Sequence, residues 1–364
     1  MRIVHLSDIH LSEDNFTEFI NNYRSALIKD LSAYNFPIPI DLIVITGDLV
    51  DKGGYSLFKI KGFETYDSPY DIFKEVFIEP ISRDLGIPLH SFLFIPGNHD
   101  VDEREIRLYD EHMLCNEITV QNVNDYLHGN NSFTHNLRIK KFKDFEYAYH
   151  KDNLNYEFGV NQSVYFYEKE NFKIGFILIN DSWRCKSIRL KNDSDKLFFG
   201  DQQFYDGLNF LENLSTDLNI CLFHHSVDDY EESKTIRGIL QRKNIELFLY
   251  GHFHNTETNV LYTPNGTCLG FRSRAALFKP EEKESEYHSG YQILDFDLTT
   301  YKIIQVHYRK YNYKDSAKIF IADNETATNG GVDKNYLTGN NGFNLIREGR
   351  ATRPVELSKD EFIS

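Results

Sequence analysis

The sequence predicts an α/β fold from three observations. Three apolar runs rich in branched and aromatic residues indicate buried strands, at residues 2–7, 41–46 and 87–96. Two segments between them are expected to be helical, 14–31 and 70–85, the second closed by Gly86. Unbroken apolar strands suit a sheet that is covered on both faces. Strand, helix, strand, helix, strand is therefore typical of a layer in which helices cover a sheet.

The second half of the chain predicts more strands and fewer helices. A helix is expected at 201–214, and the expected strands are 163–167, 173–180, 218–223 and 245–250. After residue 250 only strand-like segments follow, at 256–262, 267–276, 290–298 and 301–308. Because these runs have no helical patterning between them, we expect a more antiparallel sheet in this half.

Length and composition limit the class of protein. The chain has 364 residues, and no apolar run reaches about 18 residues, so we expect no membrane-spanning helix and no membrane partner. The first strand begins at residue 2, which leaves no space for a cleavable signal peptide. The four cysteines lack paired metal-type spacing, which favours reduced thiols in a cytoplasm. A net charge of -15 argues against a non-specific grip on duplex nucleic acid but permits a local basic lip.

Polar side chains follow five of the predicted strands at the point where each strand ends. They are Asp8 and His10, Asp48, Asn98-His99-Asp100, His224-His225, and His252 with His254. The ends of neighbouring strands in such a sheet gather at one edge. Alternation along an extended chain places Asp8 and His10 on the same side, and His252 and His254 likewise. Carboxylate, amide and imidazole donors without a thiolate suit manganese, iron, zinc or nickel, and this set is large enough for two ions.

These motifs resemble the calcineurin-like metallophosphoesterase family, whose pattern is D-x-H, G-D, G-N-H, a strand-terminal H, and G-H-x-H. The resemblance covers roughly residues 1–310 and implies a four-layer αββα sandwich of two mixed β-sheets. It implies two divalent ions, with Mn²⁺ favoured, and a hydroxide bridging them. The implied ligands of one ion are Asp8, His10 and His254, those of the other are Asn98, His224 and His252, and Asp48 bridges both. His99 is implied to face the leaving group.

Several neighbouring residues have two interpretations. The segment 47–53 resembles the protein-phosphatase branch with Lys52 in place of its arginine, which implies that Asp51 orients His99 and Lys52 contacts the substrate; Asp51 is otherwise a turn carboxylate. Asp100 is either an acceptor behind the metal ligands or a cap. His225 is expected to contact the substrate or to support His224. Arg272 either reaches the phosphate or forms a surface salt bridge, and Trp183 either lines the pocket or packs in a loop.

Residues 101–159 are expected to form a cap inserted over the site. The segment combines basic and aromatic residues: Arg138, Lys140, Lys141, Lys143, Phe142, Phe145, Tyr147 and Tyr149. This combination either holds phosphate and stacks bases or forms a solvated helix with inward aromatic residues. We predict a catalytic domain at 1–310 and a C-terminal extension at 311–364, rich in Asn and Gly.

The motif style favours a phosphodiesterase acting on a nucleotide or a single-stranded nucleic acid. One alternative is a DNA or RNA nuclease in a bacterial defence setting, since residues 3–10 are also similar to the opening of double-strand-break repair nucleases. A second is a phosphomonoesterase, including a phosphoprotein phosphatase. A third, from a different class, is an inactive protein-binding scaffold, which resembles a retromer subunit of the same fold.

Overall fold

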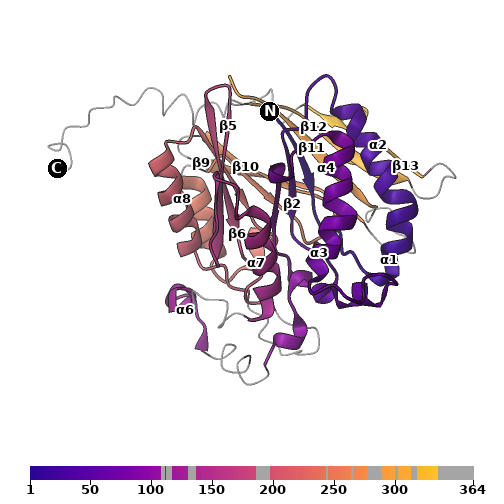
Figure 1. The fold of residues 1–364 in the computed structure, drawn as a ribbon. Helices are drawn as coiled ribbons and strands as arrows, with labels where there is room; N and C mark the ends of the chain where they lie inside the picture. Colours follow the sequence, from indigo (N-terminus) through magenta and orange to yellow (C-terminus); the bar gives the residue numbers. More distant parts are fainter. Residues whose placement is uncertain are drawn as a thin grey trace, which may run out of the picture.

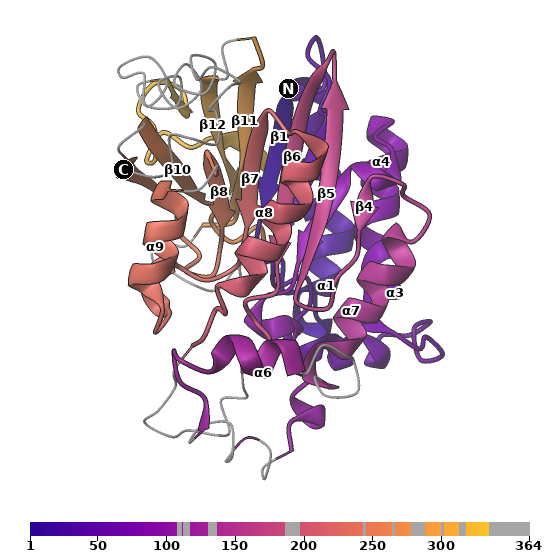
Figure 2. The ribbon, with the colours of Figure 1, turned by 90° about the vertical axis from the view of Figure 1, so that its left-hand side faces the viewer.

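The fold has four layers, with two β-sheets packed face to face and helices on both outer sides (Figure 1). The computed structural model describes residues 1–107, 111, 117–129, 137–185, 197–242, 245–263, 266–277, 288–299, 302–312 and 318–334. Both sheets are mixed, which confirms the predicted αββα sandwich. Figure 2, viewed from the side of α8, shows α8 and α9 in front of the second sheet.

The first sheet has the strand order β13-β12-β11-β1-β2-β3, with β14 paired to β12. Its strands are β1 (Arg2–Leu6), β2 (Leu42–Thr46), β3 (Phe92–Ile95), β11 (Gly290–Asp297), β12 (Lys302–Asn312), β13 (Ile319–Ala322) and β14 (Val332–Asp333). The three N-terminal strands are parallel, so that their carboxyl ends share one edge. The polar residues that follow β1, β2 and β3 are thereby brought together.

The second sheet has the order β4-β5-β6-β7-β8-β10-β9. Its strands are β4 (Tyr156–Glu157), β5 (Gln162–Lys169), β6 (Phe172–Ile179), β7 (Leu218–Leu222), β8 (Leu247–Tyr250), β9 (Glu257–Thr263) and β10 (Gly266–Arg272). The central strands β6, β7, β8 and β10 run parallel to one another. The loops after β7 and β8 therefore leave the same edge of this sheet.

The helices cover the outer face of each sheet, except α6, which lies beyond the ends of the strands (Figures 1 and 2). They are α1 (Glu13–Glu18), α2 (Arg24–Tyr34), α3 (Pro69–Phe73), α4 (Glu79–Leu85), α6 (Val123–Gly129), α7 (Leu137–His150), α8 (Gln202–Leu214) and α9 (Ser233–Arg242). The predicted helices at 14–31 and 70–85 are present, but each contains a π-helical turn, at Phe19–Tyr23 and Lys74–Ile78. Gly86 ends α4 in the left-handed conformation, with φ of 67°.

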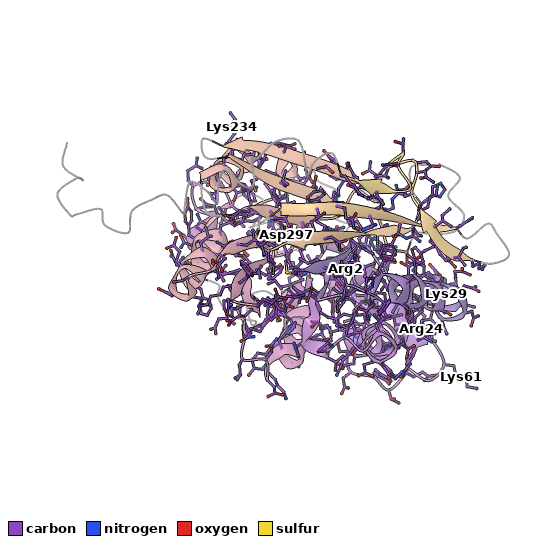
Figure 3. All side chains as sticks on the ribbon, turned by 90° about the horizontal axis from the view of Figure 1, so that it is seen from above. Arg2, Arg24, Lys29, Lys61, Lys234 and Asp297 are labelled. Carbon is purple, nitrogen blue, oxygen red and sulfur yellow. The ribbon has the colours of Figure 1, made fainter. Side chains whose placement is uncertain are left out.

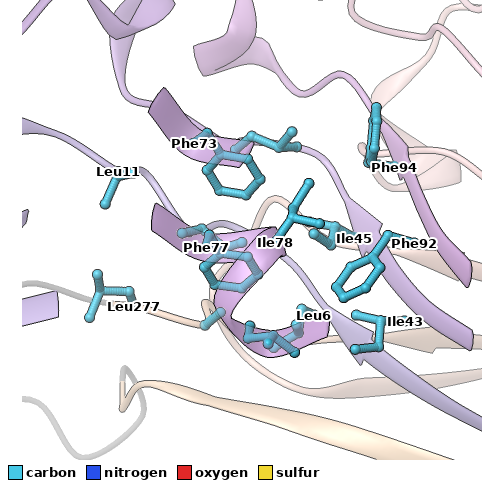
Figure 4. Close-up of a cluster of buried hydrophobic side chains, with 14 of the residues drawn as sticks. Leu6, Leu11, Ile43, Ile45, Phe73, Phe77, Ile78, Phe92, Phe94 and Leu277 are labelled. Atoms are coloured by element: carbon cyan, nitrogen blue, oxygen red, sulfur yellow. The ribbon is translucent and has the colours of Figure 1, made fainter. Parts of the chain in front are cut away.

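Apolar side chains from the helices and the first sheet form a continuous core. Figure 4 shows Phe73, Phe77 and Ile78 lying over the strand residues Ile43 and Ile45. The rings of Phe73 and Phe77 stack with centroids 5.0 Å apart. Burying each such side chain contributes about 1.5 to 3 kcal/mol, so this layer holds the carboxyl ends of the strands in fixed positions.

Charged residues lie both at the periphery of the fold and within it. Figure 3 labels Lys29, Lys61 and Lys234 near the periphery, whereas Arg2 lies among the strands. Arg2 is buried and its Nε is 2.6 Å from Asp295 Oδ1, which joins β1 to β11. Within the described part of the chain, no helix is both long and apolar enough to cross a membrane.

The C-terminal strands are divided between the two sheets. The predicted domain boundary at residue 310 falls inside β12, and β13 and β14 extend the first sheet beyond it. The last four predicted strands also do not form one sheet, because β9 and β10 join the second sheet and β11 and β12 join the first. Residues 335–364 of the predicted extension lie outside the described residues.

The described part of the predicted cap, 101–159, includes the helix α7, for which two interpretations were given. In α7, Phe142 and Phe145 are buried, and Phe145 stacks on Phe94 with centroids 5.1 Å apart. The basic residues of α7 pair with carboxylates: Arg138 with Glu111, Lys140 with Asp144, Lys141 with Asp102, and Lys143 with Glu146. The structure thus supports a helix in which Phe142 and Phe145 face inward, and phosphate binding by this segment stays a prediction.

Candidate metal centre

The polar residues predicted from the five strand ends converge at one place between the two sheets. Asp8 and His10 follow β1, Asp48 follows β2, and Asn98 follows β3. The loops after β7 and β8 add imidazoles from the second sheet. Four groups of these side chains bring their ligand atoms within 4.8 Å of one another.

One group contains Asp8, His10 and His254. The Nε2 atoms of His10 and His254 are 3.2 Å apart. Asp8 Oδ1 lies 3.4 Å from His254 Nε2 and 3.7 Å from His10 Nε2. Burial lowers the pKa of His10 to about 4, so its imidazole is neutral at neutral pH and offers a lone pair.

A second group contains Asn98, His224 and His252. Asn98 Oδ1 lies 3.0 Å from His224 Nε2 and 3.0 Å from His252 Nδ1. The other ring nitrogen of His224 is 2.7 Å from the Thr46 carbonyl oxygen, to which it donates. Because that contact assigns the proton to Nδ1, the Nε2 atom of His224 is the one available as a ligand.

Asp48 connects the two groups. Its Oδ2 atom lies 3.7 Å from His10 Nε2 and 3.3 Å from His224 Nε2. Burial would raise the pKa of Asp48, but the imidazoles of His224, His99 and His10 outweigh burial and hold it well below its ordinary value. The carboxylate is therefore ionised and can be shared between both groups.

The backbone at these positions is strained. Five of the seven predicted ligands have positive φ: Asp8, His10, Asp48, His252 and His254. Residues other than glycine rarely adopt this conformation, and each instance costs on the order of 1 to 3 kcal/mol. Strained residues of this kind cluster at functional sites, where the backbone must direct several side chains toward one point. These loops do so.

The donor set fits two divalent cations. Two ligands on one ion, each about 2.0 to 2.2 Å from it, lie roughly 3 to 3.6 Å apart, and the separations within both groups are close to this range. Asp8 Oδ1 is also fully buried, and no hydrogen bond within the described residues satisfies it. A buried carboxylate oxygen without a hydrogen bond is costly unless a cation compensates it.

His99 lies beside the two groups and is oriented by a carboxylate. Its Nδ1 is 2.6 Å from Asp51 Oδ1, and its backbone N–H donates to Asp48 Oδ1 at 2.7 Å. Burial opposes ionisation, but Asp48 and the hydrogen bond to Asp51 raise the pKa of His99 to about 9. The predicted pairing of Asp51 with His99 is thus present in the structure.

Asp100 is an acceptor behind the ligands, as one of its two interpretations expected. Its carboxylate accepts the backbone N–H groups of Leu49, Val50 and Gly97. These hydrogen bonds tie the loop after β2 to the loop after β3. The relative position of Asp48 and Asn98 depends on them.

Asp181, which follows β6, is a site residue that the sequence analysis missed. It is fully buried and accepts the backbone N–H groups of His224 and His225, at 3.0 and 2.8 Å to its Oδ2. The Nδ1 of His225 and the hydroxyl of Tyr230 also bond to this carboxylate. Burial would raise the pKa of Asp181, but its pairing with His225 lowers it. One carboxylate thus fixes the loop that carries His224.

Asp181→Asn should weaken metal binding without removing a ligand. The asparagine places an amide N–H₂ among N–H donors, and loss of such an outer-shell partner typically costs about 10- to 100-fold in metal affinity. Titration with Mn²⁺ measures it. Glu246→Gln is the matched control, because Glu246 is also buried but holds Asn219 at the opposite end of β7. Equal metal affinities in the two variants would contradict the role given to Asp181.

Gly97 is required by close approach. A Cβ at this position would lie 2.7 Å from Asp48 Cγ and closer still to its Oδ1. Gly97→Ala should therefore displace Asp48, lower stability by about 1 to 3 kcal/mol as overpacking does, and reduce bound metal. Thermal unfolding and metal analysis check this expectation. Gly238→Ala, in α9 with open space around it, should leave both quantities intact.

The three residues predicted to contact the substrate have different surroundings in the structure. Lys52 is exposed, with its Nζ 3.9 Å from Asp51 Oδ2. His225 is buried and held by Asp181, and its Nε2 is 3.6 Å from Cys185 Sγ. Arg272 does not point a free guanidinium at the site, because its Nη1 is 2.7 Å from Glu257 Oε2. The salt-bridge interpretation of Arg272 therefore applies.

The loop residues Trp183 and Arg184 pack rather than line the metal centre. Trp183 is buried with Ile118, Val123, Leu127 and Phe198. Arg184 pairs with Glu111, which also pairs with Arg138. The packing interpretation given for this loop is thus the one that the structure supports.

Comparison with known proteins adds a family match and distant structural likenesses. A family model described as calcineurin-like phosphoesterase matches residues 1–256. No curated protein matches the sequence.

Among solved structures, Vps29 from Entamoeba histolytica complexed with zinc is 12% identical, with 88% of this chain and 97% of that chain covered and a TM-score of 0.34. A dimetal phosphatase from Danio rerio is 11% identical (85% and 95% covered, TM-score 0.40). A putative 5′-nucleotidase from Staphylococcus aureus is 10% identical (96% and 57% covered, TM-score 0.40). At these values the likenesses say nothing about activity.

Proposed function

Because this chain belongs to the calcineurin-like phosphoesterase family, we propose that it hydrolyses phosphodiesters of nucleotides or nucleic acids with two divalent metal ions, Mn²⁺ preferred. The observation that carries the proposal is the position of Asp48, whose Oδ2 lies within 3.7 Å of imidazoles from both ligand groups. A carboxylate shared in this way is what a pair of adjacent ions requires.

The chain's residues divide into two ligand sets. Asp8, His10 and His254 would hold one ion, Asn98, His224 and His252 the other, and Asp48 both. When bound, such a pair of ions activates the attacking water and offsets charge on the phosphoryl group. The oxygen donors of this set suit Mn²⁺, and its imidazoles suit iron, zinc or nickel as well. Burial lowers the pKa of His224, but the charge of Asp48 outweighs burial and raises this pKa to about 9. Metal binding must therefore release a proton from His224.

His99 is the residue that we assign to protonation of the leaving oxygen. Its Nδ1 is committed to Asp51 at 2.6 Å, so the proton to be transferred is the one on Nε2. The carboxylate of Asp51 fixes the ring and stabilises its protonated form. Asp100 and Asp181 hold the loops on either side of the metal ligands and do not contact the reacting atoms in this assignment.

The charges around the centre favour a diester over a monoester. The described arginines that follow β6 and end β10 are paired with carboxylates: Arg184 with Glu111, and Arg272 with Glu257. Lys52 contributes a point charge without the bidentate fork that suits a phosphate dianion. A diester carries one negative charge and needs less compensation than a monoester.

The complete ligand set disfavours the scaffold alternative. A protein that uses this fold only to bind a partner has no need for a buried unsatisfied carboxylate oxygen at Asp8, or for positive φ at five ligand positions. Each of these features costs stability. Their presence together supports an enzyme.

A substrate panel tests the proposed function. Metal-stripped protein is reloaded with Mn²⁺ and assayed with bis-p-nitrophenyl phosphate, p-nitrophenyl phosphate, cyclic nucleotides and single-stranded DNA. We expect hydrolysis that depends on Mn²⁺ and is faster for the diesters. Faster hydrolysis of p-nitrophenyl phosphate would contradict the diester assignment, and hydrolysis of none of the four would contradict the enzyme.

A further inference from the structure

Phe253 is an exposed aromatic residue beside the candidate metal centre. It stands between the predicted ligands His252 and His254, yet 44% of its surface is exposed. Single exposed apolar residues are common in proteins and need no explanation by themselves. This one contacts two neighbouring side chains, the imidazole of His252 and the guanidinium of Arg272.

The loop around Phe253 leaves the ring little freedom. His252 and His254 have φ of 77° and 59°, and the Phe253 N–H donates to the Gly251 carbonyl oxygen at 3.0 Å. The ring meets the His252 imidazole edge to face, with centroids 4.9 Å apart and an interplanar angle of 70°. Because His252 is itself a predicted ligand, this contact places the Phe253 ring beside the metal site.

Arg272 supports the ring from behind. Its Cζ lies 5.2 Å from the Phe253 ring centroid. The guanidinium is itself fixed, by Glu257 Oε2 at 2.7 Å and by the Asn255 carbonyl oxygen at 3.0 Å, and the residue is buried. A cation placed over an aromatic face is attractive and holds the ring against rotation. The exposed surface of Phe253 therefore lies away from Arg272.

We propose that the open face of Phe253 stacks on a nucleobase of the substrate, with Arg272 as the positioning residue that holds the ring. The inference rests on the proposed function, because the base must be joined through its sugar to the phosphate at the metal centre. Every nucleobase has a π face, so stacking of this kind selects nucleotide diesters without selecting a base. A single nucleotide unit and a single-stranded nucleic acid share this chemistry.

The test measures base stacking without turnover. The probes are a dinucleotide and a single-stranded oligonucleotide that contain 2-aminopurine, whose fluorescence is quenched by stacking, and that have a methylene group in place of the bridging oxygen. They are titrated into Mg²⁺-loaded protein. Phe253→Ala should weaken binding by roughly 5- to 150-fold, the range found when one stacking side chain is removed. Phe253→Leu should weaken it similarly, and Phe253→Trp should preserve it.

Phe210→Ala is the matched control, because Phe210 is also exposed, at 37%, but lies on α8. A loss with the dinucleotide supports a nucleotide subsite, and a loss confined to the longer probe supports a nucleic-acid subsite. Binding to Phe253→Ala, or to Phe253→Leu, that equals binding to the unaltered protein overturns the inference. The proposed function is judged separately, by Mn²⁺-dependent hydrolysis of the ordinary dinucleotide by the unaltered protein.

Discussion

Replacing Asp48 with asparagine should abolish hydrolysis and remove bound metal. Asp48 Oδ2 lies near imidazoles of both ligand groups, at 3.7 Å from His10 Nε2 and 3.3 Å from His224 Nε2. The amide of asparagine carries no charge. The two cations would therefore lose the negative charge that Asp48 supplies to both. The loss of affinity should exceed the roughly 10- to 100-fold typical of an outer-shell change. Metal analysis after gel filtration measures it.

Lys52→Ala is the control for this experiment, since Lys52 lies nearby but is exposed and offers no ligand to a cation. It should keep both ions. The Asp48→Asn variant must also unfold cooperatively, because a destabilised protein would lose metal for another reason. Two tightly bound ions in a folded Asp48→Asn protein would show that the carboxylate is not shared.

Alanine at position 99 should lower the turnover number for a phosphodiester by a factor on the order of 100 to 10,000, as loss of a general acid does. His99 is not a predicted ligand, and only its backbone N–H donates to Asp48, a contact that alanine retains. The variant should therefore keep its metal and its fold. Steady-state kinetics with Mn²⁺ give the turnover number.

Asp51→Asn separates orientation from proton transfer. The Asp51 carboxylate bonds to His99 Nδ1, so its replacement should lower the turnover number less than removal of His99 itself.

The choice of substrate tests the role of His99 as an acid. A substrate with a good leaving group needs little protonation, so His99→Ala should lower the turnover number less with this substrate than with a poor leaving group. Full turnover by His99→Ala with a poor leaving group would refute the assigned role.

The main features of the centre could be predicted from the sequence because they follow from strand ends. A buried strand is a short apolar run, and the first polar residues after it leave the sheet at its edge, as Asp8 and Asp48 do. Family resemblance then divided these donors between two ions. The structure brings together all seven predicted ligands, and the Asp51 carboxylate contacts His99 Nδ1.

Other features depend on contacts that a sequence does not display. Asp181 follows β6 just as Asp48 follows β2, but a lone carboxylate gives no sign that backbone N–H groups will surround it. Helix α9 was not predicted, although Ile236, Ile239 and Leu240 have helical spacing and two parallel strands, β7 and β8, need a crossover. The pairing of Arg272 with Glu257 likewise follows from the register of β9 and β10.

The long-range pairing of β11 with β1 was also beyond prediction. Antiparallel strands distant in sequence carry no local signal of which sheet they will join, so the sequence did not indicate that β11 and β12 pair with the N-terminal strands. In α7, basic and aromatic residues alternate in a way that suits either a nucleic-acid surface or an amphipathic helix. The stacking of Phe145 on Phe94 and the pairing of Arg138 with Glu111 support the amphipathic helix.

The central claim is that two ions share Asp48, and electron paramagnetic resonance of the Mn²⁺-loaded protein tests it most directly. Metal analysis should find two Mn²⁺ per chain, and the spectrum should show a spin-coupled pair. One ion per chain, or two whose spectrum is that of isolated Mn²⁺, would contradict a shared centre.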